Sequence, residues 1–135
     1  MIQTETILKV VDNTGAKTVK CIKVLSGNRY AYTGDCILVS IKSIKSTKSA
    51  GTGSVKKGQI YKALVIRTKK GILNRKDGTF VSFQRNDAVL IQGDTSASTA
   101  DTSALIGSRI FGPITRELRA KNYKKIISKS RQRML

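Results

Sequence analysis

Short apolar runs separated by turn residues are the feature that most constrains the fold of this chain. Segments rich in Val, Ile and Leu dominate its first two thirds, and most of them end at Gly, Asn or Asp. This spacing is typical of β-strands joined by tight turns. We expect strands at residues 7–11, 19–25, 36–42, 60–68, 79–83 and 88–91.

One of these runs is apolar at consecutive positions instead of alternating. Residues 63–66 read Ala-Leu-Val-Ile, so both faces of that strand must be covered. A closed barrel with additional cover outside meets this requirement better than an open sheet with one face in water. We therefore predict a mainly β fold, a small closed five-stranded β-barrel. The hairpin signal Asp77-Gly78 further predicts that the basic stretch 67–76 forms a protruding β-ribbon.

The character of the chain changes near Pro113, a residue that suits a helix N-terminus. Ile114 and Leu118 follow it four positions apart, which predicts short C-terminal helices at 114–121 and 123–128. Segments rich in Ser, Thr and Gly or Ala predict loops at 43–54 and 93–103. With 135 residues we expect a single domain, 1–135, made of a barrel at about 1–92, a mobile loop at about 93–104 and a C-terminal helical segment at about 105–135.

Charge indicates the class of partner. The chain carries 26 Lys and Arg against 8 Asp and Glu, a formal net charge of +18, and the excess is spread along its whole length. Such a protein is expected to bind a polyanion on several faces. A membrane surface is the main alternative to nucleic acid, but it would favour a longer amphipathic helix than this chain offers. We expect nucleic acid and no membrane.

Enzyme chemistry finds little support in the composition. The chain has no His, and Asp12, Asp35 and Asp77 adjoin turns, where a short carboxylate usually bonds to backbone amides. Cys21 and Cys36 lie in apolar runs and are expected to be buried thiols, although a disulfide between them remains geometrically possible. Without four Cys or His ligands there is no zinc site. We expect no catalytic residue, no metal site and no cofactor beyond structural Mg ions of a bound RNA.

The missing residue types indicate which nucleic acid is bound. The chain has 3 Phe, 4 Tyr and no Trp, too few and too scattered for a single-strand stacking surface, and no long basic helix that would enter a DNA groove. Recognition of folded RNA through its phosphates and shape remains. Two alternatives stay open: a free single-strand binder that uses Tyr30, Tyr32 and Tyr61, and a small nuclease that uses Asp12, Asp35, Asp77 and Asp87.

The stretch ALVIRTKKGILNRKDGTFVSFQRNDAVL, residues 63–90, resembles the signature of the large-subunit ribosomal protein 14 family. Four more blocks agree in order and spacing: MIQTET, VDNTGAKTVKCIKVL, the approach to the third strand at 30–35, and SRIFGPITRELR followed by KIIS. The resemblance spans nearly the whole chain. It implies a non-enzymatic structural constituent of the large ribosomal subunit that acts in translation and binds large-subunit rRNA directly near the subunit interface.

Partners and sites follow from the same resemblance. Relatives pack beside large-subunit ribosomal protein 19, contribute to a bridge with small-subunit rRNA, and in bacteria and organelles receive the ribosomal silencing factor. The residues expected to bind rRNA are Asn13, Lys17, Lys20, Lys23, Arg29, Lys42, Lys56, Lys57, Arg67, Lys69, Lys70, Arg75 and Lys76. The face expected to meet protein partners and the bridge comprises Ser108, Arg109, Arg116, Arg119 and Lys124. The long loops and frequent Lys and Ile favour an organelle-encoded, mitochondrial source over a bacterial one.

Overall fold

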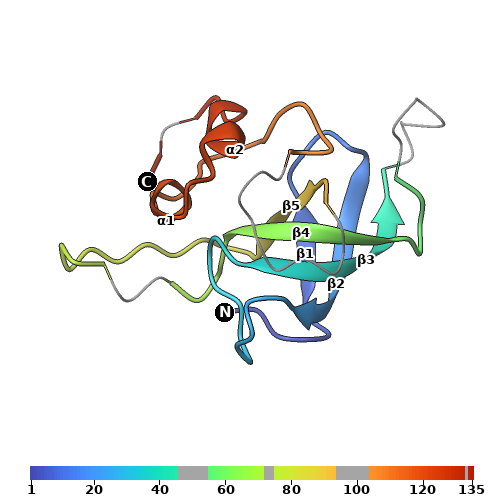
Figure 1. The fold of residues 1–135 in the computed structure, drawn as a ribbon, viewed down its shortest axis with the longest axis horizontal. Helices are drawn as coiled ribbons and strands as arrows, with labels where there is room; N and C mark the ends of the chain where they lie inside the picture. Colours follow the sequence, from blue (N-terminus) through green and yellow to red (C-terminus); the bar gives the residue numbers. More distant parts are fainter. Residues whose placement is uncertain (46–54, 72–74, 94–103, 133) are drawn as a thin grey trace.

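The chain forms a closed barrel of five strands followed by two short helices (Figure 1). The computed structural model describes residues 1–45, 55–71, 75–93, 104–132 and 134–135. The strands are β1 (Ile7–Val10), β2 (Ala16–Val24), β3 (Cys36–Ile44), β4 (Ile60–Arg67) and β5 (Asp87–Ile91), and the helices are α1 (Glu117–Ala120) and α2 (Lys124–Ser128). The predicted fold class, a closed five-stranded barrel with short C-terminal helices, is confirmed.

The barrel closes through one parallel contact. Each strand pairs antiparallel with the next from β1 to β5, and β5 then pairs parallel with β1, where Lys9 lies opposite Asp87 and Val10 opposite Ala88. Register shifts interrupt the long β2–β3 ladder, and each leaves one residue with no residue opposite it on the neighbouring strand. Closure removes the exposed strand edges that an open sheet would have.

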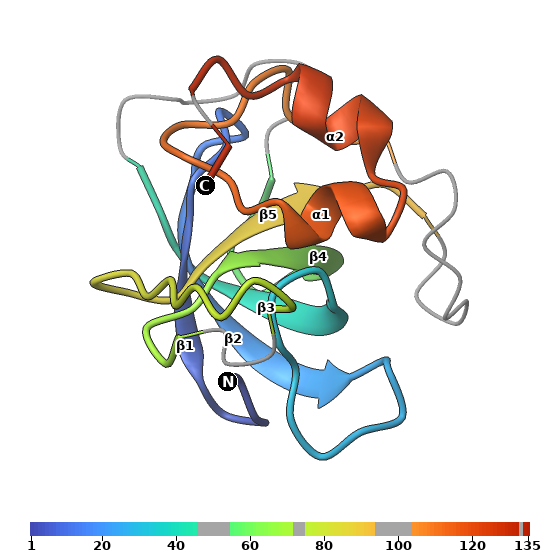
Figure 2. The same ribbon diagram turned by 90° about the vertical axis from the view of Figure 1, so that its left-hand side faces the viewer.

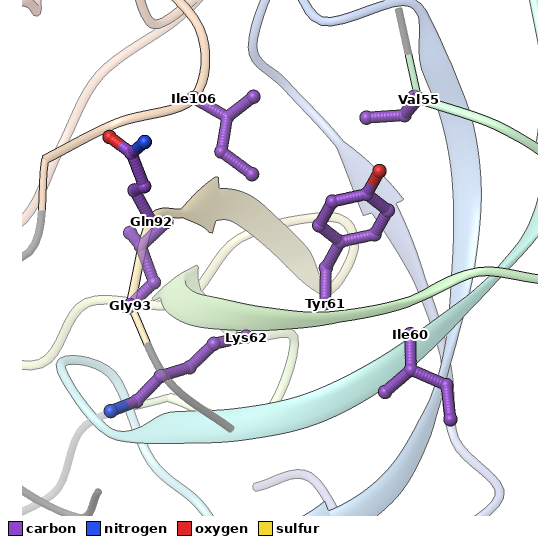
Figure 3. Close-up of a pocket in the computed structure, with 8 residues that line it drawn as sticks. Val55, Ile60, Tyr61, Lys62, Gln92, Gly93 and Ile106 are labelled. Carbon is purple, nitrogen blue, oxygen red and sulfur yellow. The ribbon is translucent and has the colours of Figure 1, made fainter. Parts of the chain in front are cut away.

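A shallow hollow of about 360 Å³ lies where β4 begins and β5 ends (Figure 3). Its lining is mostly apolar, with Tyr61 and Ile60 from β4, Ile106 beyond β5, and the Lys62 side chain among them. Lys62 lies opposite Ile91 in the β4–β5 ladder. The described residues of the lining include no acid.

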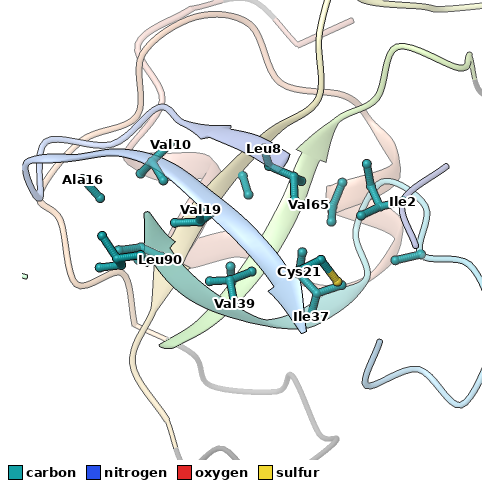
Figure 4. Close-up of a cluster of buried hydrophobic side chains, with 14 of the residues drawn as sticks. Ile2, Leu8, Val10, Ala16, Val19, Cys21, Ile37, Val39, Val65 and Leu90 are labelled. Atoms are coloured by element: carbon teal, nitrogen blue, oxygen red, sulfur yellow. The ribbon is translucent and has the colours of Figure 1, made fainter. Parts of the chain in front are cut away.

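The interior of the barrel holds the first of two apolar cores (Figure 4). Every strand contributes to it, as Leu8, Val19, Val39, Val65 and Leu90 illustrate, all fully or almost fully buried. Val65 lies inside because its neighbours in sequence point the other way, as the two-residue period of a strand requires. The side chains converge in the close-up and fill the space between the strands.

The second core lies outside the barrel, between β4, β5 and the C-terminal helices. Leu64 and Val89 point outward into it, and they share it with Leu118 of α1, Tyr123 just before α2 and Ile126 of α2. Figure 2 shows both helices lying over β4 and β5. The consecutive apolar residues 63–66 are explained by this arrangement, because β4 is covered on both faces.

The predicted ribbon is a protrusion without a regular ladder between its described limbs. The chain between β4 and β5 extends far from the barrel (Figure 1). The strand expected at 79–83 is wrong: only Val81 makes an isolated bridge, and Phe83 N donates to the Thr68 carbonyl oxygen at 3.2 Å. Thr79, Phe80 and Val81 have high strand propensity, but strands need a paired neighbour to form.

The predicted helix at 114–121 begins later than expected, at Glu117. The backbone before α1 pairs instead with the chain end, since Leu135 N donates to Ile114 O at 2.8 Å and Arg116 N donates to Leu135 O at 2.9 Å. The second helix is confirmed near its predicted bounds.

Both predicted loops are only partly described. Ser43 and Ile44, expected in the first loop, belong to β3. The rest of that loop from residue 46 and residues 94–103 of the second lie outside the described residues. Gln92 N donates to Ala104 O at 2.7 Å, which joins the described ends of the second loop.

Candidate nucleic-acid interface

The described acids are all engaged within the molecule. Asp12 is buried, and its carboxylate accepts hydrogen bonds from backbone amides. Its Oδ1 accepts from Thr14 N at 3.0 Å and its Oδ2 from Leu90 N at 2.9 Å. The other acids form ion pairs, which are Glu5–Lys20, Asp35–Lys121, Asp77–Arg116, Asp87–Arg67, Asp87–Arg85 and Glu117–Arg75. Bonding of Asp12, Asp35 and Asp77 to backbone amides in turns is confirmed.

Many exposed cations are left with no acid as a partner among the described residues. They are Lys9, Lys17, Lys23, Arg29, Lys42, Lys45, Lys56, Lys57, Lys69, Lys70, Lys76, Arg109, Arg119, Lys124, Lys125, Lys129 and Arg131. Their mutual repulsion is a standing cost to the compact state that phosphates would relieve.

Four of these lysines, Lys9, Lys17, Lys23 and Lys42, lie on the outer surface of β1, β2 and β3, which we call the barrel wall. Lys17 and Lys42 lie at register shifts of the β2–β3 ladder, where each has no residue opposite it on the neighbouring strand. Bulges of this kind turn a side chain away from the regular sheet surface. All four lysines are exposed to solvent, whereas Val19 and Ile41 on the same strands are buried in the core.

Lys17, Lys23 and Lys42 of the wall were predicted to bind rRNA, whereas Lys9 was not. Five other predicted rRNA-binding residues lie in turns and in the ribbon. Lys56 and Lys57 occupy a tight turn before β4, where Gln59 N donates to Lys56 O at 3.3 Å. Lys69, Lys70 and Lys76 are exposed on the protrusion. Arg29 lies elsewhere, with its guanidinium carbon 5.6 Å from the centre of the Tyr30 ring, and Lys20 on β2 pairs with Glu5.

Arg67 has an internal role instead of an exposed one. It is 8% exposed at the end of β4; its Nε lies 3.1 Å from Asp87 Oδ2, and its Nη2 donates to the Phe111 carbonyl oxygen at 2.6 Å. Burial lowers the pKa of Arg67 and raises that of Asp87, and the attraction between the charges offsets only part of this effect. The guanidinium therefore ties β4 and β5 to the C-terminal segment.

Arg75 is likewise committed to an internal contact. Its Nε donates to Glu117 Oε1 at 2.6 Å and its Nη2 to Glu117 Oε2 at 3.1 Å, the forked geometry typical of strong Arg–carboxylate pairs. A second pair joins residues next to these in sequence: Arg116 Nη1 lies 2.9 Å from Asp77 Oδ2. We call these four side chains the ribbon–helix junction, because each pair joins the protrusion to the start of α1.

Proton affinities at the junction follow from these contacts. Burial disfavours the charge of Glu117, but hydrogen bonds, chiefly from Arg75, hold its pKa below the usual value. The hydrogen bond to Glu117 raises the pKa of Arg75. A hydrogen bond from Thr79 lowers the pKa of Asp77, with Arg116 adding to the effect. All these groups are therefore charged at neutral pH.

The structure brings Asn13 together with two residues of the expected partner face. Asn13 Nδ2 donates to Ser108 Oγ at 2.6 Å, and its Oδ1 accepts from Ser108 N at 2.7 Å and more weakly from Arg109 N. Arg119 and Lys124 belong to α1 and α2 and are exposed. The two predicted sets, one for rRNA and one for other partners, thus meet at Asn13.

Phe111 and Lys45 join Arg109 in a cluster that no sequence pattern predicts. Lys45 Nζ lies 6.0 Å and Arg109 Cζ 5.1 Å from the centre of the Phe111 ring, which is exposed. The signal that could have found Phe111 is an aromatic residue two positions after an Arg and directly before Gly112-Pro113, in a loop. Lys45 carries no local signal, because only the fold brings it near.

The described residues hold no arrangement typical of catalysis or metal binding. No group of three or more acids or cysteines in this part of the chain could hold a metal ion. Both cysteines are free and buried, and burial raises the pKa of Cys21 to about 11. Neither described helix is long and apolar enough to cross a membrane.

A sequence model of one protein family, described as ribosomal protein L14p/L23e, matches residues 1–134. The match covers almost the entire chain, and it agrees with the closed barrel and the cationic surface described above. Family membership gives the chain a structural, non-enzymatic role in translation, with rRNA and ribosomal proteins as partners. The match does not distinguish a bacterial from an organellar ribosome. The chain belongs to the ribosomal protein L14p/L23e family of the large ribosomal subunit.

Proposed function

We propose that this chain binds large-subunit rRNA directly through the barrel wall and the exposed lysines of the turn before β4 and the protrusion. The observation that carries this proposal is the separation of its charges. Every described acid is engaged within the molecule, and the cations left over include Lys17, Lys23 and Lys42 on one continuous strand pair. Lysines that cannot be neutralised internally are suited to phosphates.

Arg67 and Arg75 enter this proposal as supports and not as phosphate ligands. Both guanidinium groups are occupied by carboxylates within the molecule. They fix where the protrusion and the C-terminal segment lie, so that Lys69, Lys70 and Lys76 are presented in a defined orientation. Asn13 supports the site in the same way, through its bonds to Ser108.

The C-terminal surface forms the second part of the proposal. We assign to Ser108, Arg109, Arg116, Arg119 and Lys124 a role at the subunit interface, in contact with small-subunit rRNA and, in turn, with the ribosomal silencing factor. Large-subunit ribosomal protein 19 is the proposed neighbour within the subunit. Support comes from the exposed, uncompensated charges of Arg109, Arg119 and Lys124 and from the agreement of this segment with the family signature.

Two matched triple variants test the division between the surfaces. The first, Lys17→Gln/Lys23→Gln/Lys42→Gln, removes three charges from the barrel wall; the second, Lys124→Gln/Lys125→Gln/Lys129→Gln, removes three from the C-terminal segment. Affinity for isolated large-subunit rRNA is measured across a range of salt concentrations. The wall variant should lower the slope of log affinity against log salt by about two to three, since each neutralised phosphate contributes about 0.7–0.9.

The second variant should affect binding to this RNA much less and should instead weaken the joining of the two subunits, measured by sedimentation. Equal losses of rRNA affinity in both variants would show that charge acts without regard to position, and the assignment of the barrel wall would then fail.

A further inference from the structure

Phe111 presents an aromatic ring to solvent between two cations. Its side chain is 45% exposed, although large apolar side chains in a small domain are mostly buried. Lys45 Nζ and Arg109 Cζ lie 6.0 Å and 5.1 Å from the ring centre. Both distances are within the range of a cation–π interaction.

The backbone that carries this ring is held firmly. Phe111 N donates to Val11 O at 2.8 Å, and its carbonyl oxygen accepts from Arg67, which is itself anchored by Asp87. The next residue, Gly112, has φ of 87°, and a Cβ there would lie 2.4 Å from Arg67 Nη1. The backbone from which the ring projects is therefore held in place, which favours a preorganised contact.

The two cations at the ring, Lys45 and Arg109, have no described anion to neutralise them. Lys45 and Arg109 repel each other across one small surface, and neither pairs with an acid in the described part of the chain. An anionic partner with a flat, polarisable group would satisfy the ring and both cations together. A nucleotide has this combination, because its base can stack and its phosphate can meet the cations.

Other exposed aromatic residues lack this combination. Phe80 is 60% exposed but has no cation over its ring among the described residues, and the ring lies so close to Gly71 that a Cβ there would meet it at 2.2 Å. Tyr32 lies beside an acid, since its backbone N donates to Asp35 Oδ2 at 2.8 Å. Phe111 is distinguished among these three by its two cations.

We propose that Phe111, Arg109 and Lys45 form a stacking site for one unpaired nucleobase of ribosomal RNA. The base stacks against the ring and the guanidinium plane, while Lys45 and Arg109 meet the adjacent phosphates. The inference deepens the proposed function and rests on it for RNA as the partner. Large-subunit and small-subunit rRNA offer the same chemistry, and the experiment separates them.

Phe111→Leu in the full-length chain tests the site, with Phe111→Tyr as the variant that keeps an aromatic ring and Phe80→Leu as the matched control. Binding to isolated large-subunit rRNA and to isolated small-subunit rRNA is measured across salt concentrations. Phe111→Leu should weaken binding to one of these RNAs by at least about fivefold, the order expected for loss of one base–aromatic stack. The salt slope should not change, because no charge is removed.

Phe111→Tyr and Phe80→Leu should stay within about twofold of the unaltered chain. Arg109→Lys keeps the charge but loses the planar group, and should weaken binding to the same RNA at an unchanged salt slope. The RNA that responds identifies the source of the base. Unchanged affinity of Phe111→Leu for both RNAs would overturn the inference and leave the proposed function intact. Salt-independent binding by the unaltered chain would overturn the proposed function, and the inference with it.

Discussion

The barrel wall and the ribbon–helix junction use the same kinds of charge in opposite ways. On the wall, Lys9, Lys17, Lys23 and Lys42 face solvent with no acid among the described residues as a partner. At the junction, each cation meets a carboxylate within 3 Å. The difference lies in where the few acids are placed.

The type of cation differs as well. The junction and the buried pair at Asp87 use arginines, while the wall uses lysines only. A guanidinium holds a carboxylate in a forked, directional contact, whereas an ammonium is a mobile point charge on a flexible stem. Arginine therefore occupies the junction and the buried pair, where the geometry must be fixed, and lysine occupies the wall, where a phosphate can be met in several orientations.

This contrast teaches that a high net charge does not make every cation a ligand. A Lys or Arg in this chain can fix the position of a segment or attract RNA, and its neighbours decide which contribution is larger. Variants of the two classes should therefore change different measured quantities: the free energy of unfolding in one class and the salt slope of RNA binding in the other.

Arg67→Met should produce the largest effect on stability. The substitution leaves the buried Asp87 carboxylate with only the more distant charges of Arg85 and Lys9 and removes the donor to Phe111 O. Breaking a buried pair in this way typically costs about 3–5 kcal/mol, to be measured by urea unfolding. The double variant Arg67→Met/Asp87→Asn should recover much of the loss, because no unpaired charge remains. A loss below about 1 kcal/mol in the single variant would show that the pair does not hold the segments together.

Arg75→Gln should have a smaller effect, and its neighbour provides the control. Loss of the forked contact with Glu117 should lower the free energy of unfolding by about 1–2 kcal/mol, since hydrogen bonds between charged groups contribute about that much. Lys76→Gln removes the same charge from an exposed side chain with no acidic partner among the described residues. It should leave stability within about 0.5 kcal/mol.

For RNA binding we expect the opposite order: Lys76→Gln should have the larger effect and Arg75→Gln the smaller one. Lys76→Gln should lower the salt slope by about 0.7–0.9 if it meets one phosphate, while Arg75→Gln should leave the slope unchanged. If the slope fell equally in both variants, the distinction between structural and RNA-binding cations would not hold in the protrusion.

Much of the barrel could be predicted from the sequence, because its evidence is local. The consecutive apolar residues 63–66 required cover on both faces, and the two cores provide it. The strand expected at 79–83 failed for a reason that no local pattern contains: its residues suit a strand, but apart from the isolated bridge at Val81 they join no ladder among the described residues. Pro113 similarly predicted a helix start that the pairing of Ile114 with the chain end prevents.

The sequence predicted that the candidate site is cationic, but it did not predict which cations pair with acids inside the molecule and which remain available to RNA. The lysines at turns and strand surfaces could be recognised one by one, since each lies in an exposed local context. The pairing of Arg75 with Glu117 joins residues 42 positions apart, and the approach of Lys45 to Phe111 depends equally on the fold. Contacts of this kind decide which cations are already occupied, so the sequence alone presents Arg75 and Lys76 as equivalent.

Acidification should produce the smallest effect and should act on the junction selectively. The pKa of Glu117 is lowered in the folded state from its usual 4.5, so its contribution to stability is complete above that value and is lost as the pH falls through the folded pKa. Asp77 shifts in the same direction. Asp87 has the opposite sign, because burial raises its pKa, and acid therefore relieves part of its cost.

Because these contributions oppose each other, global unfolding does not isolate the pH dependence of the junction. Hydrogen exchange of individual amides does. Below pH 4.5, the protection of α1 amides such as Ala120 and Lys121, which donate to Arg116 O and Glu117 O, should fall relative to that of amides in β2. The change should correspond to at most about 1 kcal/mol, the usual limit for a partly exposed ion pair. Glu117→Gln should abolish most of this pH dependence. On β2 the described acid contact is the Glu5–Lys20 pair, whose carboxylate is exposed. Equal loss of protection in β2 and α1 would therefore mean that the junction is not a separate electrostatic unit.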